Sequence, residues 1–274
     1  MSSMEIILFK LAFALCTLST AGYLLSLLIK RVALAKISTW ILVITAGLLT
    51  INLFLSLINP AGYVQLGSRE FFSFCAWAIA VAYLVIQIKT KTRLLGAFIS
   101  PFILLLMIAA AGQEAGRSLV PEDMRSWLTI VHLVLVIAGE ALFVLASCAG
   151  AMFIIQNSLL KHKKSSRMSR LLPALNDLDR INHLCLLWGF PVLTLGLFAG
   201  VIFAGFTWER GWSADPKIIW TFAAWATYGF LLHQRLAVGW KGIRMAVMSC
   251  AVFILFLLSY SGVRFCFSTL HDFI

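Results

Sequence analysis

Long apolar segments recur along the whole chain, and the charged residues gather in the short stretches between them. Eight of these segments are long enough to predict helices that cross a bilayer, since one crossing needs about 20 apolar residues. Their approximate ranges are 4–29, 37–58, 71–88, 94–112, 127–156, 182–206, 217–234 and 244–267. In lipid, only a helix satisfies its backbone groups within one such segment. The pattern therefore predicts an all-α polytopic membrane protein with about eight transmembrane helices.

Two polar stretches between the apolar segments also predict local structure. The sequence Val-Pro-Glu-Asp at 120–123 is typical of a helix start, because proline fits the first turn and acids favour the positive end of the helix dipole. Between 171 and 181, leucine and isoleucine recur at helical spacing, with Asp179 and other polar residues on the opposite face. This second stretch predicts a short amphipathic helix at the inner membrane surface.

Composition narrows the class of protein further. Hydrophobic residues make up 61% of the 274 residues and charged residues 12%, which is about half the charged share of an ordinary soluble domain. A soluble chain of this size has too much surface to cover with so few charges. A cytosolic enzyme, a disordered chain and a secreted domain are therefore excluded.

The net charge of +11 would suggest a nucleic-acid partner in a soluble protein. In this chain, however, the positively charged residues are concentrated in particular loops. Fifteen of the 22 lysines and arginines lie in or beside the loops after the first, third, fifth and seventh segments, and five lie beside the opposite loops. Loops rich in lysine and arginine face the cytoplasm. We therefore expect a bacterial inner-membrane protein with both termini on the outer side, surrounded by lipid and without a nucleic-acid partner.

The placement of the histidines is the main clue to function. His132 lies near the outer end of the fifth segment, and His271 follows the eighth segment on the same side. His183 opens the sixth segment from the cytoplasmic side, and His233 closes the seventh segment there. Ionisable groups in membrane segments tend to mark sites, although a histidine at a boundary can also bond only to water or headgroups. Each side thus carries a pair of histidines from different helices.

A pair of histidines suits haem iron better than it suits zinc. Zinc prefers four close ligands, and no thiol or carboxylate stands beside these pairs at ligand spacing. Two imidazoles on opposite faces of a porphyrin are sufficient for haem. Trp208 and Trp212 can supply flat apolar surfaces on the outer side, and Arg264 precedes His271 by seven residues, near enough to meet a propionate. The alternative for the tryptophans is that they anchor the loop at the membrane interface.

The order of these motifs resembles a known family. The stretch 207–217, Thr-Trp-Glu-Arg-Gly-Trp-Ser-Ala-Asp-Pro-Lys, resembles the tryptophan-rich WWD segment of CcsA/CcmC/CcmF-type proteins of cytochrome c assembly. His132 precedes this stretch, and His233 follows it directly before a Gly-Trp-Lys-Gly turn at 239–242. His271 comes last, as in that family.

The resemblance covers about residues 127–274. It divides the chain into four N-terminal helices over 1–126 and four helices over 127–274 that carry the haem-handling segment. The resemblance implies that His132 and His271 bind haem on the outer side and that His233 belongs to an inner haem site. His183 is the expected partner of His233 only because it lies on the same side of the membrane.

The expected cofactor is haem b, held non-covalently by two histidines, with one or two haems per chain. The residues expected to bind it are His132, His183, His233 and His271 as iron ligands, with Trp208, Trp212, Asp215 and Arg264 around them. Asp215 and Pro216 can also begin the seventh helix, as a cap and a first-turn proline.

The sequence departs from the family pattern at Ala214 and Ile218, and it has no large domain outside the membrane. These departures favour the HemX-like eight-helix branch, linked to haem biosynthesis. The expected function is to bind haem and to transfer or present it across the membrane, without catalysis, beside proteins of haem biosynthesis or cytochrome c assembly. Three alternatives stay open: the haem-presenting subunit of a cytochrome c synthetase, a bis-histidine electron-transfer cytochrome, and a transporter without haem.

Overall fold

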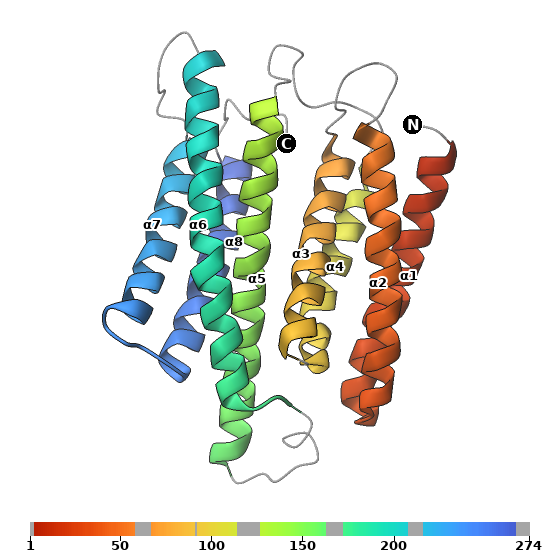
Figure 1. Cartoon of the computed structure of the whole chain (residues 1–274), viewed down its shortest axis with the longest axis vertical. Helices are drawn as coiled ribbons and strands as arrows, with labels where there is room; N and C mark the ends of the chain where they lie inside the picture. The colour runs from red at the N-terminus through yellow and green to blue at the C-terminus, as the bar shows by residue number, and fades with distance from the viewer. Residues whose placement is uncertain are drawn as a thin grey trace. The chain divides into compact units, whose positions relative to one another are not determined.

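The structure, a computed structural model, describes residues 3–57, 67–90, 92–113, 127–162, 172–207 and 216–266. All regular structure in these ranges is helical, and Figure 1 shows the long helices. They are α1 (Ser3–Ile29), α2 (Val32–Leu57), α3 (Ser68–Thr90), α4 (Gly96–Ala111), α5 (Trp127–Lys161), α6 (Leu175–Thr207), α7 (Pro216–Leu236) and α8 (Ile243–Cys266), with a 3-10 turn η1 (Arg93–Leu95) before α4. Each long helix matches one of the eight apolar segments predicted above.

Six of the helices, α1 to α6, are long and apolar enough to cross a membrane, and α8 contains a shorter apolar stretch over Ile243–Leu258. Large apolar side chains are exposed on many of them, for example Ile88 at 79% and Trp188 at 63%. Exposing so much apolar surface to water is unfavourable, whereas contact with lipid tails accommodates it. The prediction of an all-α polytopic membrane protein is confirmed.

The chain forms two compact units, one built from α1 to α4 and the other from α5 to α8. In the first unit, α1 packs against α2 and α4, and α3 packs against the same two helices. Tyrosine hydroxyls tie this unit together inside: Tyr23 donates to Thr39 Oγ1 at 2.9 Å, and Tyr83 donates to the Arg93 carbonyl at 3.0 Å. Because these hydroxyls bond to protein groups, the cost of burying them is offset.

Glycines bring α5 and α6 of the second unit into close contact. A Cβ at Gly139 of α5 would lie 3.0 Å from the backbone of Leu193, and a Cβ at Gly196 of α6 would lie 2.8 Å from the Val136 nitrogen. Backbone atoms cannot move aside as the end of a flexible side chain can. Small residues let helix backbones approach in membrane proteins, so these glycines set the spacing of the two helices.

One local prediction is wrong. The stretch 171–181 does not form a separate interfacial helix, because α6 begins at Leu175 and runs without a break to Thr207. Leu178 and Ile181 are fully buried, so the apolar face that was assigned to the membrane surface packs inside the second unit. The predicted helix start at 120–123 lies outside the described residues, whereas the predicted start of a helix at Pro216 is confirmed.

Candidate functional site

His132 lies in the second turn of α5, and its ring reaches the neighbouring helix α6. The ring nitrogen Nδ1 lies 2.7 Å from the Gly196 carbonyl oxygen, which is hydrogen-bond distance. The carbonyl oxygen can only accept a proton, so Nδ1 must be the donor. In the neutral ring this leaves the Nε2 atom unprotonated, with its lone pair available to a metal. A hydrogen bond from the other ring nitrogen is how proteins usually orient a histidine that binds a metal.

Gly200, one turn after Gly196, completes the support of the His132 ring. A Cβ on Gly200 would lie 2.6 Å from both Nδ1 and Cε1 of His132, which is closer than atoms that are not bonded can approach. The ring therefore occupies the space that a side chain at position 200 would fill. The sequence predicts His132 as a site residue, and the glycine spacing 196–200 is its one sign of this support.

His183 and His233, the pair predicted for the cytoplasmic side, lie at the opposite end of the second unit. His183 is on α6, seventeen residues before Gly200, which corresponds to about 25 Å along a straight helix. Its Nδ1 atom is buried and has no hydrogen-bond partner. His233 is in the last turn of α7, and its side chain is exposed. No hydrogen bond joins these two described side chains.

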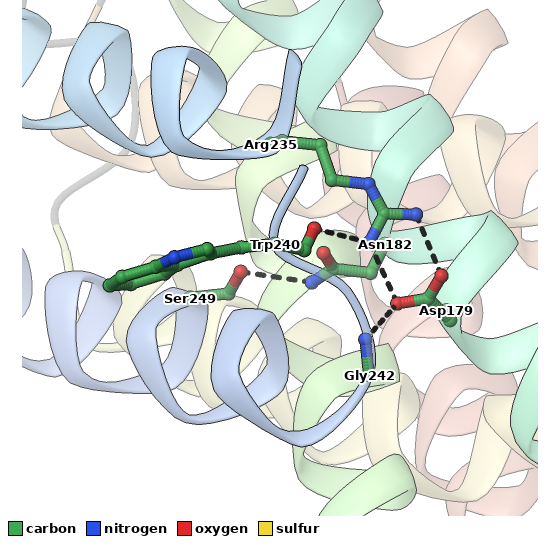
Figure 2. A network of polar contacts seen from close by, with 6 residues as sticks. All are labelled: Asp179, Asn182, Arg235, Trp240, Gly242 and Ser249. Atoms are coloured by element: carbon green, nitrogen blue, oxygen red, sulfur yellow. Dashed lines mark hydrogen bonds and ion pairs between the residues drawn. The ribbon is translucent and has the colours of Figure 1, made fainter. Parts of the chain in front are cut away.

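The region beside them is held together by an ion pair, which Figure 2 shows from close by. Arg235 of α7 donates from both terminal nitrogens to the carboxylate of Asp179 on α6, at 2.8 and 2.7 Å. The same carboxylate accepts the Gly242 backbone N–H at 2.7 Å, and Arg235 also donates to the Trp240 carbonyl at 3.2 Å. Asp179 therefore connects α6 to the end of α7 and to the turn that leads into α8.

Asn182 extends the same network to two other helices. Its amide nitrogen donates to the Ala146 carbonyl of α5 at 2.8 Å and to the Ser249 hydroxyl of α8 at 3.0 Å. By sequence, Asp179 lies on the polar face of the stretch 171–181, and Arg235, which is close to His233, is a candidate to meet a haem propionate. The structure shows instead that Asp179 holds the Arg235 guanidinium, whose side chain is only 7% exposed.

Aromatic side chains fill the space between α6 and α7 midway along the second unit. The Trp225 indole donates to Thr194 Oγ1 at 2.9 Å and stacks on Phe190 at a centroid distance of 5.6 Å. By sequence, Trp225 stands eight residues before His233 and is a candidate aromatic wall for a haem held there. Its ring is engaged with α6 in the structure, so it tightens the contact of the two helices.

The other predicted site residues fall outside what the structure describes. They are His271, Trp208, Trp212 and Asp215, together with the side chain of Arg264, whose backbone belongs to α8. Among the described residues, no three histidine, cysteine or acidic side chains come together to hold a metal ion. Haem iron needs only two protein ligands. The predicted histidine pairs therefore do not depend on a cluster of three or more ligands.

The chain is also similar to a known protein family. A family model described as Cytochrome C assembly protein matches residues 66–271. The chain belongs to the cytochrome c assembly protein family. The match begins before α3, so it extends further toward the N-terminus than the motifs that carried the resemblance in the sequence.

Several relatives within this family are each named cytochrome c biogenesis protein CcsA. The protein from Prochlorococcus marinus (strain CCMP1986 / NIES-2087 / MED4) is 30% identical over 268 residues, covering 87% of this chain and 84% of the relative. The protein from Chlorella vulgaris is 28% identical over 258 residues, covering 82% of each. The protein from Chlamydomonas reinhardtii is 28% identical over 254 residues, covering 89% of this chain and 69% of the relative. The finer placement in a HemX-like branch stays a prediction.

Proposed function

We propose that this protein binds haem within the membrane and presents it on the outer side for cytochrome c assembly. Its membership of the cytochrome c assembly family supports this role, as does the name of its relatives. The observation that carries the proposal is the ring of His132. Because its Nδ1 donates to the Gly196 carbonyl at 2.7 Å, its Nε2 atom would be available to bind haem iron.

At the outer site, His132 and His271 would hold the haem iron. Trp208 and Trp212 would supply apolar surface for the porphyrin, and Arg264 would supply a positive charge for a propionate. Asp215 would serve as the cap of α7 at the end of the tryptophan-rich segment. When bound, haem supplies the group that is to be attached to the cytochrome. The residues of this chain bind it and orient it, and the attachment itself is left to a partner.

At the inner site, His233 is the ligand that the structure supports best, because its ring is exposed at the end of α7. His183 is its proposed partner, with a buried Nδ1 atom that has no hydrogen bond. His183 has a buried ring nitrogen on α6 and His233 is exposed at the end of α7, so a haem between them would require one or both rings to turn. The inner pair is therefore tested separately from the outer pair below.

The second candidate is the haem-presenting subunit of a cytochrome c synthetase, with a partner that supplies the outer domain for apocytochrome. The relatives' shared name, cytochrome c biogenesis protein, favours this candidate over an electron-transfer cytochrome and over a transporter without haem. Both candidates place the protein in the inner membrane, use the same histidines and need no catalytic group from this chain. They differ in whether a synthetase partner copurifies with the protein.

The test of the outer site is an absorption spectrum and a haem count on protein purified from haem-replete membranes. We expect one or two low-spin haems per chain. His132→Ala and His271→Ala should each remove outer haem or change the spectrum of its reduced form. His162→Ala is the matched control, since His162 is exposed at the end of α5 among lysines. Wild-type protein without haem, or two variants that both keep the wild-type spectrum, would rule out the outer site.

The inner site is tested by haem titration of the His132→Ala/His271→Ala double variant. We expect a remaining low-spin haem that disappears when His233→Ala is added. Loss on adding His183→Ala supports the pairing of His183 with His233. Retention of the low-spin spectrum with His183→Ala shows that His233 has another partner, and His183 is then excluded as a ligand.

A further inference from the structure

The end of α7 and the turn after it, residues 233–242, are held both by their own backbone hydrogen bonds and by polar contacts with α6. We propose that Asp179 is the positioning residue for His233, acting through Arg235 and the backbone of Gly242. This inference rests on the proposed function, in which His233 is an inner haem ligand. No hydrogen bond joins Asp179 to His233 in the described part of the chain, so the proposed effect on that ring is exerted through Arg235 and Gly242.

The backbone around His233 is fixed first by the turn itself. The Ala237 N–H donates to the His233 carbonyl at 2.8 Å, and the Trp240 N–H donates to the Gln234 carbonyl at 3.0 Å. Gly239 closes the turn with a φ of +78°, a left-handed conformation that glycine adopts without strain. The carbonyl of His233 is therefore part of a hydrogen-bonded helix end rather than of a fraying one.

Asp179 then fixes this helix end to the rest of the second unit. Its carboxylate accepts two bonds from Arg235 and one from the Gly242 N–H, so it binds the chain on both sides of the turn. The ion pair is bidentate and largely shielded, with side-chain exposures of 7% for Arg235 and 17% for Asp179. Bidentate arginine–carboxylate pairs restrict geometry as well as adding attraction, so the pair sets the rotation of α7 about its own axis.

That rotation determines the direction of His233. Two residues along an α-helix differ in direction by about 200°. Arg235 points toward Asp179 of α6, as Figure 2 shows, so position 233 lies on a different face of α7, and His233 is exposed there. If the ion pair is lost, α7 can turn and its last turn can fray, and His233 no longer presents its nitrogen in one direction.

Asn182 provides a matched comparison within the same network. It lies three residues after Asp179 and bonds to Ala146 of α5 and Ser249 of α8, and no hydrogen bond joins its side chain to the described residues of α7. Removing the Asn182 amide therefore weakens the packing of α6 against α5 and α8. It leaves both bonds between Asp179 and Arg235 in place, so a general loss of stability can be separated from a loss of positioning.

The experiment uses the full-length chain with His132→Ala, so that haem at the outer site is weakened or absent. Asp179→Ala and Asn182→Ala are compared by haem titration and by amide hydrogen exchange of the peptide 233–242. For Asp179→Ala we expect at least a tenfold faster exchange of the Trp240 and Gly242 amides. We also expect at least a tenfold weaker haem affinity and a partly high-spin spectrum, which added imidazole returns to low spin. Asn182→Ala should keep the low-spin spectrum and slow exchange.

The two failures are distinguishable. If His233→Ala abolishes the low-spin spectrum but Asp179→Ala leaves it unchanged, or if Asp179→Ala and Asn182→Ala change it equally, the positioning role is overturned and the proposed function stands. If His233→Ala itself has no effect, His233 is not a ligand, and the inner site and the positioning role fall together, whatever the exchange rates are. If Asp179→Ala is not recovered, it is replaced by Asp179→Asn, which keeps an acceptor for the Gly242 N–H but lacks the charge. A low-spin signal between those of the wild-type protein and His233→Ala supports the proposal. A wild-type spectrum overturns it.

Discussion

At the scale of single residues, Gly200 is the position where the smallest change has a defined consequence for the proposed outer site. A Cβ there would lie 2.6 Å from two atoms of the His132 ring, so Gly200→Ala must push the ring away from the Gly196 carbonyl. Overpacking of this kind costs about 1–3 kcal/mol. We expect weaker haem binding at the outer site, measured by titration, together with partial loss of the low-spin spectrum.

Gly205→Ala is the control for this prediction, because it lies on the same helix and a Cβ there meets no atom within 4 Å. It should bind haem as the wild-type protein does. Equal haem affinity in both variants would show that the contact between His132 and α6 does not matter for binding.

The residue scale is also where the sequence was least informative. The sequence predicts His132 as a site residue and Pro216 as a helix start, because nearby residues along the chain are enough to single them out. It did not reveal the acceptor for His132, since a backbone carbonyl has no sequence signature. It also placed Asp179 toward solvent, because the partner Arg235 lies 56 residues further on and on another helix.

At the scale of helices, the contact of α5 with α6 depends on glycine at position 139. A Cβ at Gly139 would lie 3.0 Å from the backbone of Leu193, so Gly139→Ala must separate the two helices. We expect this variant to lower the Tm of the detergent-solubilised protein, with a cost of about 1–3 kcal/mol. The measurement is a thermal unfolding curve followed by circular dichroism.

Gly47→Ala on α2 is the same replacement at an uncrowded position and serves as the comparison. A Cβ at Gly47 meets nothing within 4 Å, and alanine is favoured over glycine within helices by about 0.5–1 kcal/mol. Its Tm should stay the same or rise slightly. A Tm for Gly139→Ala at or above that of the wild-type protein would contradict the account of close packing.

The helices themselves followed from the hydrophobic pattern, because in a membrane protein each long apolar segment has one structural solution. The failure at 171–181 has a physical reason. An apolar face at helical spacing has the same sequence whether lipid headgroups or other helices cover it. Burial of Leu178 and Ile181 shows that other helices cover it here, and only the three-dimensional structure could decide this.

At the scale of the whole molecule, the distribution of cations leads to a prediction about orientation. Most lysines and arginines lie beside the loops after the first, third, fifth and seventh segments, so both termini should lie outside the cytoplasm. Alkaline phosphatase fused after Ile274 should be active in cells, and green fluorescent protein fused there should be dark. The same two reporters inserted between Lys161 and His162 should give the reverse pattern. An inactive phosphatase and a bright fluorescent protein at the C-terminus would reverse the assignment of inner and outer sites.

The hydrogen bond of His132 has a genetic consequence. The partner that orients a functional histidine is often a carboxylate, and a single codon change can remove it. Here the acceptor is the main-chain oxygen of Gly196, which most replacements at that position would retain. Point mutations can therefore disturb this histidine by crowding it but not by deleting its acceptor. Among uncharged residues, a saturation screen of positions 196 and 200 should rank tolerated replacements by volume, with little influence of polarity.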